Sequence, residues 1–388
     1  MVSAYNAFHH SETHLRLGLT LLAVTTLAAA WPANAQQRSF VTGGRAAMGM
    51  PADLTASVTF ADVDGDGDQD VLYGNGRHWP QSNEVYLNNG RGQFTVGYPL
   101  GPEKATTYAT PAGDLDGDGD LDVVVGNDQA ENWVYLNNGR GRFHLAWPVG
   151  PEIEPARSAQ LFDLNGDGAL DALFTNRGAA NGFYLNIGGG HFGPKVEFGD
   201  PDGSTIAVAV GDVDQDGDND LVLANRDGQA NQILINDGTL EFSASRTFGT
   251  GSDETRSVQL ADFNGDGLLD IAAINIGEPN AVHLGLGGGQ FGPGTTFGSD
   301  ENSYAAAVSD LDGDGDLDLI VANVGSPNQV WFNDGKAVIW TRLVLGDGAE
   351  STYGVAAADL NGDGFPDIGF ANSAALNPIY MNTTTPRR

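Results

Sequence analysis

An acidic nine-residue segment, DVDGDGDQD at residues 62–70, returns six more times along the chain. The other copies are DLDGDGDLD (114–122), DLNGDGALD (163–171), DVDQDGDND (212–220), DFNGDGLLD (262–270), DLDGDGDLD (310–318) and DLNGDGFPD (359–367). Successive copies begin 48–52 residues apart. A fixed period of this length indicates a repeat architecture, and any fold of this chain must place seven similar units side by side.

Each repeat except the last contains four short apolar runs separated by turn residues, a pattern typical of β-strands. In the sixth repeat the first three runs are AAAVS (305–309), LIVAN (319–323) and NQVWFN (328–333), and a Gly-rich turn precedes the fourth. No segment shows a sustained helical period. Four strands per repeat are the signature of a propeller blade, so the sequence predicts an all-β, seven-bladed β-propeller of four-stranded blades.

The two ends of the chain complement each other. The seventh repeat stops at residues 377–388 without a fourth run. Residues 38–49 precede the first repeat at about the distance at which a fourth run precedes the acidic segment of the next repeat. We therefore predict that an N-terminal strand completes the last blade and removes the open edges of a linear array. The predicted organisation is a signal peptide at 1–35 and a propeller at 36–388, with blades at about 52–100, 101–150, 151–199, 200–249, 250–298, 299–346 and 347–382 plus 37–49.

The N-terminus resembles a secretory signal. Arg16 precedes an apolar run at residues 17–30, and Ala33 and Ala35 form a small-residue cleavage signature. We expect a mature chain from about Gln36 that is secreted, periplasmic or on the cell surface, with no membrane span. The chain has no cysteine, so disulfides cannot stabilise it.

Composition restricts the partners. The chain carries 51 acidic and 18 basic residues and a formal net charge of −33. Nucleic acids and anionic membranes are therefore excluded as expected partners, because both require clustered Lys and Arg. A cationic partner fits this charge, metal ions are the simplest one, and we expect a monomer.

The acidic segment has the pattern of a calcium loop. Asp stands at positions 1, 5 and 9 of all seven copies, Asp or Asn at position 3, Gly at position 6, and an apolar residue at position 2. Ca²⁺ takes six to eight oxygen ligands, and Gly allows the loop to turn sharply around the ion. Zn²⁺ is disfavoured because the loops lack Cys and His, and Mg²⁺ because it retains its waters. The alternative is a set of metal-free Asp/Gly hairpin turns.

The predicted ligands are side-chain oxygens at positions 1, 3, 5 and 9 and the backbone carbonyl at position 7. In the four copies with Asp at position 3 they are Asp62, Asp64, Asp66, Asp68 and Asp70; Asp114, Asp116, Asp118, Asp120 and Asp122; Asp212, Asp214, Asp216, Asp218 and Asp220; and Asp310, Asp312, Asp314, Asp316 and Asp318. In the three copies with Asn they are Asp163, Asn165, Asp167, Ala169 and Asp171; Asp262, Asn264, Asp266, Leu268 and Asp270; and Asp359, Asn361, Asp363, Phe365 and Asp367. We expect up to seven Ca²⁺, bound more weakly by the three loops with fewer charges.

These loops, followed by units of the form NxVYLNxG, resemble FG-GAP or VCBS-type repeats, the bacterial relatives of the integrin alpha-subunit propeller. The resemblance covers roughly residues 37–385 and implies Ca²⁺ in the hairpin between the first two strands of each blade. FG survives only at Phe192-Gly193 and Phe291-Gly292, and GAP is replaced by pairs such as Gly126-Asn127. Integrin-type partner binding is therefore not implied. The family includes adhesins, lectins and some polysaccharide lyases, so the fold does not decide the function.

The face opposite the calcium loops is free for recognition. Two asparagines flank the turn between the second and third strands of every repeat, as at Asn75 and Asn83, and we interpret them as turn caps rather than as a ligand ring. The loop of the first repeat, GNGRHWPQSN (74–83), is about three residues longer than its counterparts. The candidate ligand-binding residues on this face are Arg77, His78, Trp79, Tyr108, Arg157, Arg256, Tyr304 and Tyr353. The alternatives are a tolerated insertion and a solvated rim of Arg–carboxylate pairs.

Catalysis has little support in the sequence. The four histidines of the expected mature chain fall in four different repeats, and no catalytic constellation is visible. We predict a calcium-binding module for binding or adhesion to carbohydrate or to a cell-surface partner. The alternatives are a polysaccharide lyase, with His78 and a tyrosine as base and acid, and a structural scaffold without a small ligand.

Overall fold

The repeated apolar runs form β-strands, because short runs rich in Val, Ile and Leu between turn residues suit a buried pleated strand. The second run of each repeat is buried along its length, as in β4 (Asp70–Asn75) and β15 (Asp220–Asn225). The computed structural model describes residues 38–42, 47–348 and 350–384, which form strands and turns but no helix. The predicted all-β class is confirmed, whereas the predicted signal peptide lies outside the described residues.

Four of the sheets are plain antiparallel meanders of four strands in chain order. They are β3 (Thr55–Ala61), β4, β5 (Glu84–Leu87) and β6 (Val96–Pro99); β14 (Thr205–Gly211), β15, β16 (Asn231–Ile235) and β17 (Ala244–Phe248); β18 (Thr255–Ala261), β19 (Asp270–Asn275), β20 (Asn280–His283) and β23 (Thr295–Phe297); and β24 (Ser303–Ser309), β25 (Asp318–Asn323), β26 (Asn328–Phe332) and β27 (Thr341–Leu345). A small hairpin of β21 (Gly285–Gly287) and β22 (Gln290–Phe291) lies between β20 and β23 in the chain.

Two repeats share one continuous sheet, because one long strand forms both the fourth strand of the second repeat and the first strand of the third. Another long strand forms the second and third strands of the second repeat. The sheet consists of β7 (Thr107–Ala109), β8 (Ala112–Gly113), β9 (Asp122–Leu136), β10 (His144–Phe162), β11 (Asp171–Asn176), β12 (Asn181–Tyr184) and β13 (Val196–Phe198). The first part of β9 pairs with β7 and β8, and its second part pairs with the start of β10. The end of β10 pairs with β11.

The last sheet joins the two ends of the chain. It contains β28 (Ser351–Ala358), β29 (Asp367–Ser373) and β30 (Asn377–Asn382). Two short N-terminal strands, β1 (Phe40–Val41) and β2 (Ala47–Met48), pair with β30 in antiparallel register.

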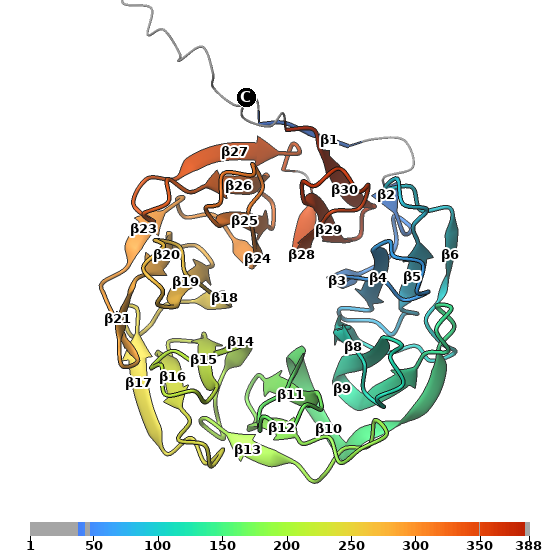
Figure 1. The fold of residues 1–388 in the computed structure, drawn as a ribbon, viewed down its shortest axis with the longest axis horizontal. Coiled ribbons are helices and arrows are strands. Elements are labelled where there is room, and N and C mark those ends of the chain that lie inside the picture. Colours follow the sequence, from blue (N-terminus) through green and yellow to red (C-terminus); the bar gives the residue numbers. More distant parts are fainter. Residues whose placement is uncertain (1–37, 43–46, 349, 385–388) are drawn as a thin grey trace, which may run out of the picture. The chain divides into compact units, whose positions relative to one another are not determined.

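Within the unit formed by Gln36–Pro386, the sheets lie around a common centre (Figure 1). The first strands of the repeats lie toward this centre, as Figure 1 shows for β3, β14, β18, β24 and β28. These strands contact one another in cyclic order, from β3 through β7, β10, β14, β18 and β24 to β28, and β28 contacts β3.

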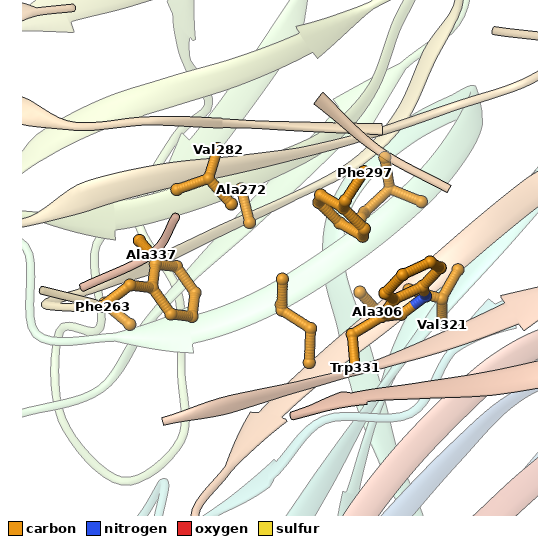
Figure 2. Close-up of a cluster of buried hydrophobic side chains, with 11 residues drawn as sticks. Phe263, Ala272, Val282, Phe297, Ala306, Val321, Trp331 and Ala337 are labelled. Atoms are coloured by element: carbon orange, nitrogen blue, oxygen red, sulfur yellow. The ribbon is translucent and has the colours of Figure 1, made fainter. Parts of the chain in front are cut away.

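Apolar side chains fill the space between neighbouring sheets. Figure 2 shows one such cluster, in which Phe297 of β23 meets Trp331 of β26 edge to face at a centroid distance of 5.3 Å. Phe263, at position 2 of an acidic loop, lies in the same cluster and is buried. The apolar residue at position 2 is buried in all seven acidic loops and so anchors each loop to the core.

The paired asparagines cap turns, as predicted. The backbone N–H of Asn75 donates to Oδ1 of Asn83 over 2.8 Å, and the equivalent bond occurs in all seven repeats. The Asn83 amide then donates to Oγ1 of Thr107 in the next sheet over 3.0 Å. Asn377 of the last sheet donates in the same way to Thr55 of the first over 3.1 Å. These buried side chains hold structure together and are not available to a ligand.

A further set of buried asparagines, which we call the cross-sheet asparagines, links five of the seven acidic loops to the next sheet. Nδ2 of Asn333 donates over 2.7 Å to the carbonyl oxygen of Phe263, at position 2 of the preceding loop. The equivalent bonds are made by Asn88 to Leu360, Asn137 to Val63, Asn186 to Leu115 and Asn382 to Leu311. Sequence reasoning did not single these residues out, although they are the second Asn of the NxVYLNxG motif.

The cross-sheet bond can be tested with two matched variants. Asn236 repeats the local contacts of Asn333 with its own turn and acidic loop, but the described structure gives it no bond to a neighbouring sheet. We expect Asn333→Ala to lower the free energy of unfolding by about 1–3 kcal/mol more than Asn236→Ala, because it leaves the buried Phe263 carbonyl unpaired. Urea unfolding measures the difference, and equal losses would contradict the assignment.

Candidate functional site: acidic loops at one end of the inner strands and an arginine–tyrosine cavity at the other

The acidic loops connect the first and second strands of each repeat, and their own backbone shapes them. In the first loop both oxygens of Asp62 accept N–H bonds, from Gly65 over 2.8 Å and from Gly67 over 2.9 Å. Gly67 has φ of +96°, and the glycine at position 6 is left-handed in every copy. No atom would obstruct a β-carbon at Gly67, so its conformation rather than lack of space requires glycine.

The aspartate at position 9 is buried in every loop and ties three segments together. In Asp70 one carboxylate oxygen accepts the N–H of Val63 over 3.0 Å, and the other accepts the N–H of Asn88 over 2.8 Å. The same two bonds recur in the other six repeats, with exposed fractions of at most 1%. Position 9 therefore has a structural role besides its predicted role as a ligand.

Burial makes these carboxylates hard to ionise without a cation. Desolvation raises the pKa of Asp70 and of Asp318 to about 7, against the opposing effect of the two backbone N–H donors. The pKa values of Asp122, Asp220 and Asp367 rise to about 6 for the same reason. Neighbouring aspartates of the same loop raise each of these pKa values further. A bound cation would remove this electrostatic cost.

Four loops bring three carboxylates close enough to share one ion. The groups have one oxygen of each member within 4.8 Å of the others, and they are Asp62, Asp64 and Asp66; Asp114, Asp116 and Asp122; Asp212, Asp214 and Asp220; and Asp310, Asp312 and Asp318. Oδ1 of Asp64 is buried without a hydrogen-bond partner. These are the four loops with Asp at position 3, and their all-oxygen donor sets fit a hard divalent cation.

Two of the loops with Asn at position 3 balance part of their own charge. Nδ2 of Asn165 donates to Asp167 over 2.9 Å, and Nδ2 of Asn264 donates to Asp266 over 3.0 Å. The N–H of Ala169 and the amide of Asn165 hold the pKa of Asp167 below its usual value. These loops need a cation less than the loops rich in aspartate.

The opposite end of the inner strands carries a repeated β-bulge. In all seven repeats the register between the first and second strands shifts at one residue. This residue directly follows a Thr, Ser or Ala near the start of the first strand. A bulge turns a side chain out of the regular ladder. We call the seven bulged residues the bulge ring; they are Ala56, Tyr108, Arg157, Ile206, Arg256, Tyr304 and Tyr353.

All seven members of the bulge ring line one cavity of about 300 Å³. Arg77 and His78 of the long first-repeat loop line it as well, as does Arg177. Seven of the eight predicted ligand-binding residues are therefore brought together. The eighth, Trp79, is 73% exposed and does not line the cavity, because the loop places its side chain in solvent.

Arginines stack on tyrosines around this cavity. The guanidinium of Arg77 lies 3.5 Å from the ring centroid of Tyr353, and that of Arg256 lies 4.4 Å from the ring of Tyr304. Tyr304 and Tyr353 in turn meet edge to face at 4.8 Å. These contacts fix the planes of the guanidinium groups, while their edges can still donate hydrogen bonds.

The alternative interpretation of these residues, a rim of Arg–carboxylate pairs, holds for only some of the arginines. Arg157 stacks on Tyr108 at 4.8 Å and also pairs with Asp128 over 2.6 Å. Arg177 pairs with Asp227 over 3.0 Å. Within the described part of the chain, no carboxylate forms an ion pair with Arg77 or Arg256.

The cavity is positively charged at neutral pH. Burial lowers the pKa of Arg256 to about 10, which leaves this side chain a cation. Burial, then Arg77 and Arg157, lower the pKa of His78, so its imidazole is largely neutral at pH 7. Burial also raises the pKa values of Tyr108 and Tyr353, which keep their hydroxyl protons.

A second cavity, of about 600 Å³, lies beside β17, β20 and β23 and was not predicted. Its lining includes Phe248, His283, Phe291 and the carboxylates Asp253 and Glu278. His283 is 6% exposed, and its Nδ1 lies 3.2 Å from the carbonyl oxygen of Gly292. No sequence motif points to this cavity, because its residues come from several separate strands and turns.

The described residues include no helix of the length and apolarity that a membrane crossing requires.

The FG-GAP-like repeat matches the chain in six overlapping segments, at residues 62–125, 114–174, 163–223, 212–273, 262–321 and 310–370. The chain therefore belongs to the FG-GAP-like repeat family, as predicted. No curated protein matches it.

Solved structures of two proteins, among others, resemble this fold. A lectin of Agrocybe aegerita, described as recognising non-reducing terminal N-acetylglucosamine, is 21% identical, with a TM-score of 0.56 over 76% of this chain and 81% of the lectin. BBS1N, solved in complex with ARL6DN after soaking with mercury or with lead, is 13% identical in both structures. The TM-scores are 0.60 and 0.61, over 89% and 91% of this chain and 97% and 99% of BBS1N. At these identities the likeness shows the propeller fold alone.

The buried aspartates predict a pH dependence of the metal-free protein. An unfolded aspartate has a pKa of about 3.9, so the folded chain retains more protons than the unfolded chain between about pH 4 and pH 7. The free energy of unfolding in chelator should therefore fall as pH rises from 5 to 7. Urea unfolding at a series of pH values measures this slope, and stability that stays constant or increases would contradict it.

Proposed function

We propose that this chain is an exported, calcium-binding β-propeller of seven blades that acts as a binding or adhesion module. Seven inner strands in cyclic contact support the blade count. The pairing of β1 and β2 with β30 supports closure by the N-terminal strand. The small-residue cleavage signature at Ala33 and Ala35 supports export.

Ca²⁺ is the proposed ion of the acidic loops. The oxygen-only donors and the short loop closed by a left-handed glycine favour Ca²⁺ over Zn²⁺, and the number of carboxylates favours it over Mg²⁺. An ion at each loop would neutralise the carboxylates that hold the ends of the inner strands. In this role the ion stabilises the fold and is remote from the bulge ring.

The proposed binding site is the cavity of the bulge ring, and its ligand is carbohydrate or a polar group of a cell-surface partner. The observation that carries this proposal is that residues from all seven inner strands and from the irregular first-repeat loop line a single cavity. Tyrosines and arginines around a concavity suit a hydroxylated ligand. The likeness to a sugar-binding lectin and to a protein-binding propeller is compatible with either class of partner.

A second candidate function is a polysaccharide lyase. His78 and three tyrosines line the same cavity, and the lowered pKa of His78 provides a neutral imidazole that could accept a proton. Release of unsaturated products from uronic-acid polymers, abolished by His78→Gln, would support this function. Binding without turnover would support the binding module.

Binding itself is tested on a glycan array with the full chain in Ca²⁺. We expect binding to a defined set of saccharides that Tyr353→Ala weakens and that Trp79→Ala leaves unchanged, since Trp79 lies outside the cavity. Absence of binding to every glycan and to cell surfaces would favour a structural scaffold.

Calcium binding is tested by titrating chelator-treated protein while recording the melting temperature. A ligand that binds only the folded state must stabilise it, so Ca²⁺ should raise the melting temperature. The increase should be larger at pH 7 than at pH 5, because protons compete for the buried aspartates. An unchanged melting temperature would refute the metal assignment.

Loop charge should set the order of filling. We expect four tight sites and up to three weaker ones by calorimetry, because four loops hold a cluster of three aspartates. Asp116→Asn should reduce the tight class by one, and Asn264→Asp should enlarge it by one. Seven indistinguishable sites would contradict this order.

A further inference from the structure

The charge of the bulge-ring cavity is opposite to that of the chain. The protein has 18 basic residues against 51 acidic ones. Yet the side chains that line this cavity include Arg77, Arg157, Arg177 and Arg256 and no aspartate or glutamate. Asp128 pairs with Arg157 and Asp227 pairs with Arg177. The remaining guanidinium groups, of Arg77 and Arg256, cost electrostatic energy unless an anion compensates them.

Two of these arginines have capacity left for a ligand. The described residues provide no carboxylate ion pair for Arg77 or Arg256. Nε of Arg256 is buried and has no hydrogen-bond partner. Burial lowers the pKa of Arg256, and the nearby Arg226, Arg77 and Arg177 lower it further, so an anion beside it would be stabilised.

The insertion in the first repeat adds Arg77 to the lining of the cavity. The bulge residue of β3 is Ala56, the smallest member of the ring. The guanidinium of Arg77 reaches over the ring of Tyr353, in the adjacent strand β28. The longer loop thus adds a cation to a cavity in which the bulge residue of the first repeat, Ala56, contributes only a methyl group.

The tyrosines determine what else the ligand must contain. Tyr304 and Tyr353 line the same cavity as the arginines, and their rings meet edge to face. A volume of about 300 Å³ is at the small end of ligand sites, and suits one or two sugar units rather than a long chain. Planar guanidinium edges match the two oxygens of a carboxylate.

We propose that the bulge ring together with Arg77 recognises a carboxylate-bearing sugar residue, with Arg77 and Arg256 binding the carboxylate and the tyrosines contacting the sugar ring. This inference rests on the proposed function of the cavity as a carbohydrate site. It adds that the ligand is anionic. It also explains why an arginine of the most irregular loop lies over the ring of a tyrosine in the last repeat.

The test compares matched pairs of saccharides. The full chain in Ca²⁺ is titrated by calorimetry with a panel of uronic-acid oligosaccharides and with their carboxyl-reduced, neutral counterparts. We expect carboxyl reduction to weaken binding roughly 10- to 100-fold, because a hydrogen-bonded charge is lost. Arg256→Gln and Arg77→Gln should each weaken the acidic ligand by a similar factor and change the neutral ligand little.

Controls separate a lost site from a lost fold. Arg140→Gln removes an exposed arginine from a turn outside the cavity, and should leave both affinities unchanged. Melting temperatures are recorded for all variants, and Arg77, in a loop, remains informative if Arg256→Gln destabilises the fold.

The outcomes distinguish the two proposals. Neutral saccharides that bind as tightly as acidic ones, in a manner sensitive to Tyr353→Ala, would overturn the anionic ligand and keep the carbohydrate site. Preference for sulfated over carboxylated sugars on the array would also overturn the carboxylate. No saccharide bound at all would overturn both the anionic sugar and the carbohydrate site, and would leave a cell-surface partner as the ligand of the proposed function.

Discussion

The buried aspartate at position 9 of each acidic loop is the interaction on which the rest of the structure depends. Its two oxygens accept the N–H of the buried residue at position 2 and the N–H at the end of the third strand. One side chain therefore joins the loop to the core and to the third strand. In five repeats the residue at that strand end, a cross-sheet asparagine, extends the link to the preceding sheet. Because the chain has no disulfide, these polar links and the apolar clusters between sheets hold the repeats together.

The inner strands separate two sites with unbalanced charge of opposite sign. At one end, aspartates crowd around loops that require positive charge, and we propose that Ca²⁺ supplies it. At the other end, arginines crowd around a cavity that requires negative charge, and we propose that a ligand supplies it. An inner strand of seven residues, such as β3, spans roughly 20 Å, so the two sites act through the rigidity of the strand rather than by direct contact. In this account the ion fixes the strand, and the strand presents the bulged side chain.

Much of this organisation could be predicted from the sequence, because it repeats. Seven copies of one loop with a fixed period indicated the blades, and the invariant Gly67-type residue indicated the turn. Features that differ from one repeat to the next, or that leave no mark in the repeat pattern, were harder to predict. The bulge that turns Tyr108 and Arg256 into the cavity is a shift in register, which leaves no period of its own. The exposure of Trp79, and the contact of Arg77 with Tyr353, depend on the path of one irregular loop. The cavity that contains His283 is assembled from strands and turns that share no motif.

The account can be tested most directly by a crystal structure of the full chain grown with Ca²⁺ and with a saccharide that the protein binds. The account predicts ion density in the acidic loops, strongest in the four with three clustered aspartates, and saccharide density against Arg77, Arg256 and Tyr353. Loops without ions, or a saccharide bound away from the bulge ring, for example in the cavity beside β17 and β20, would contradict it.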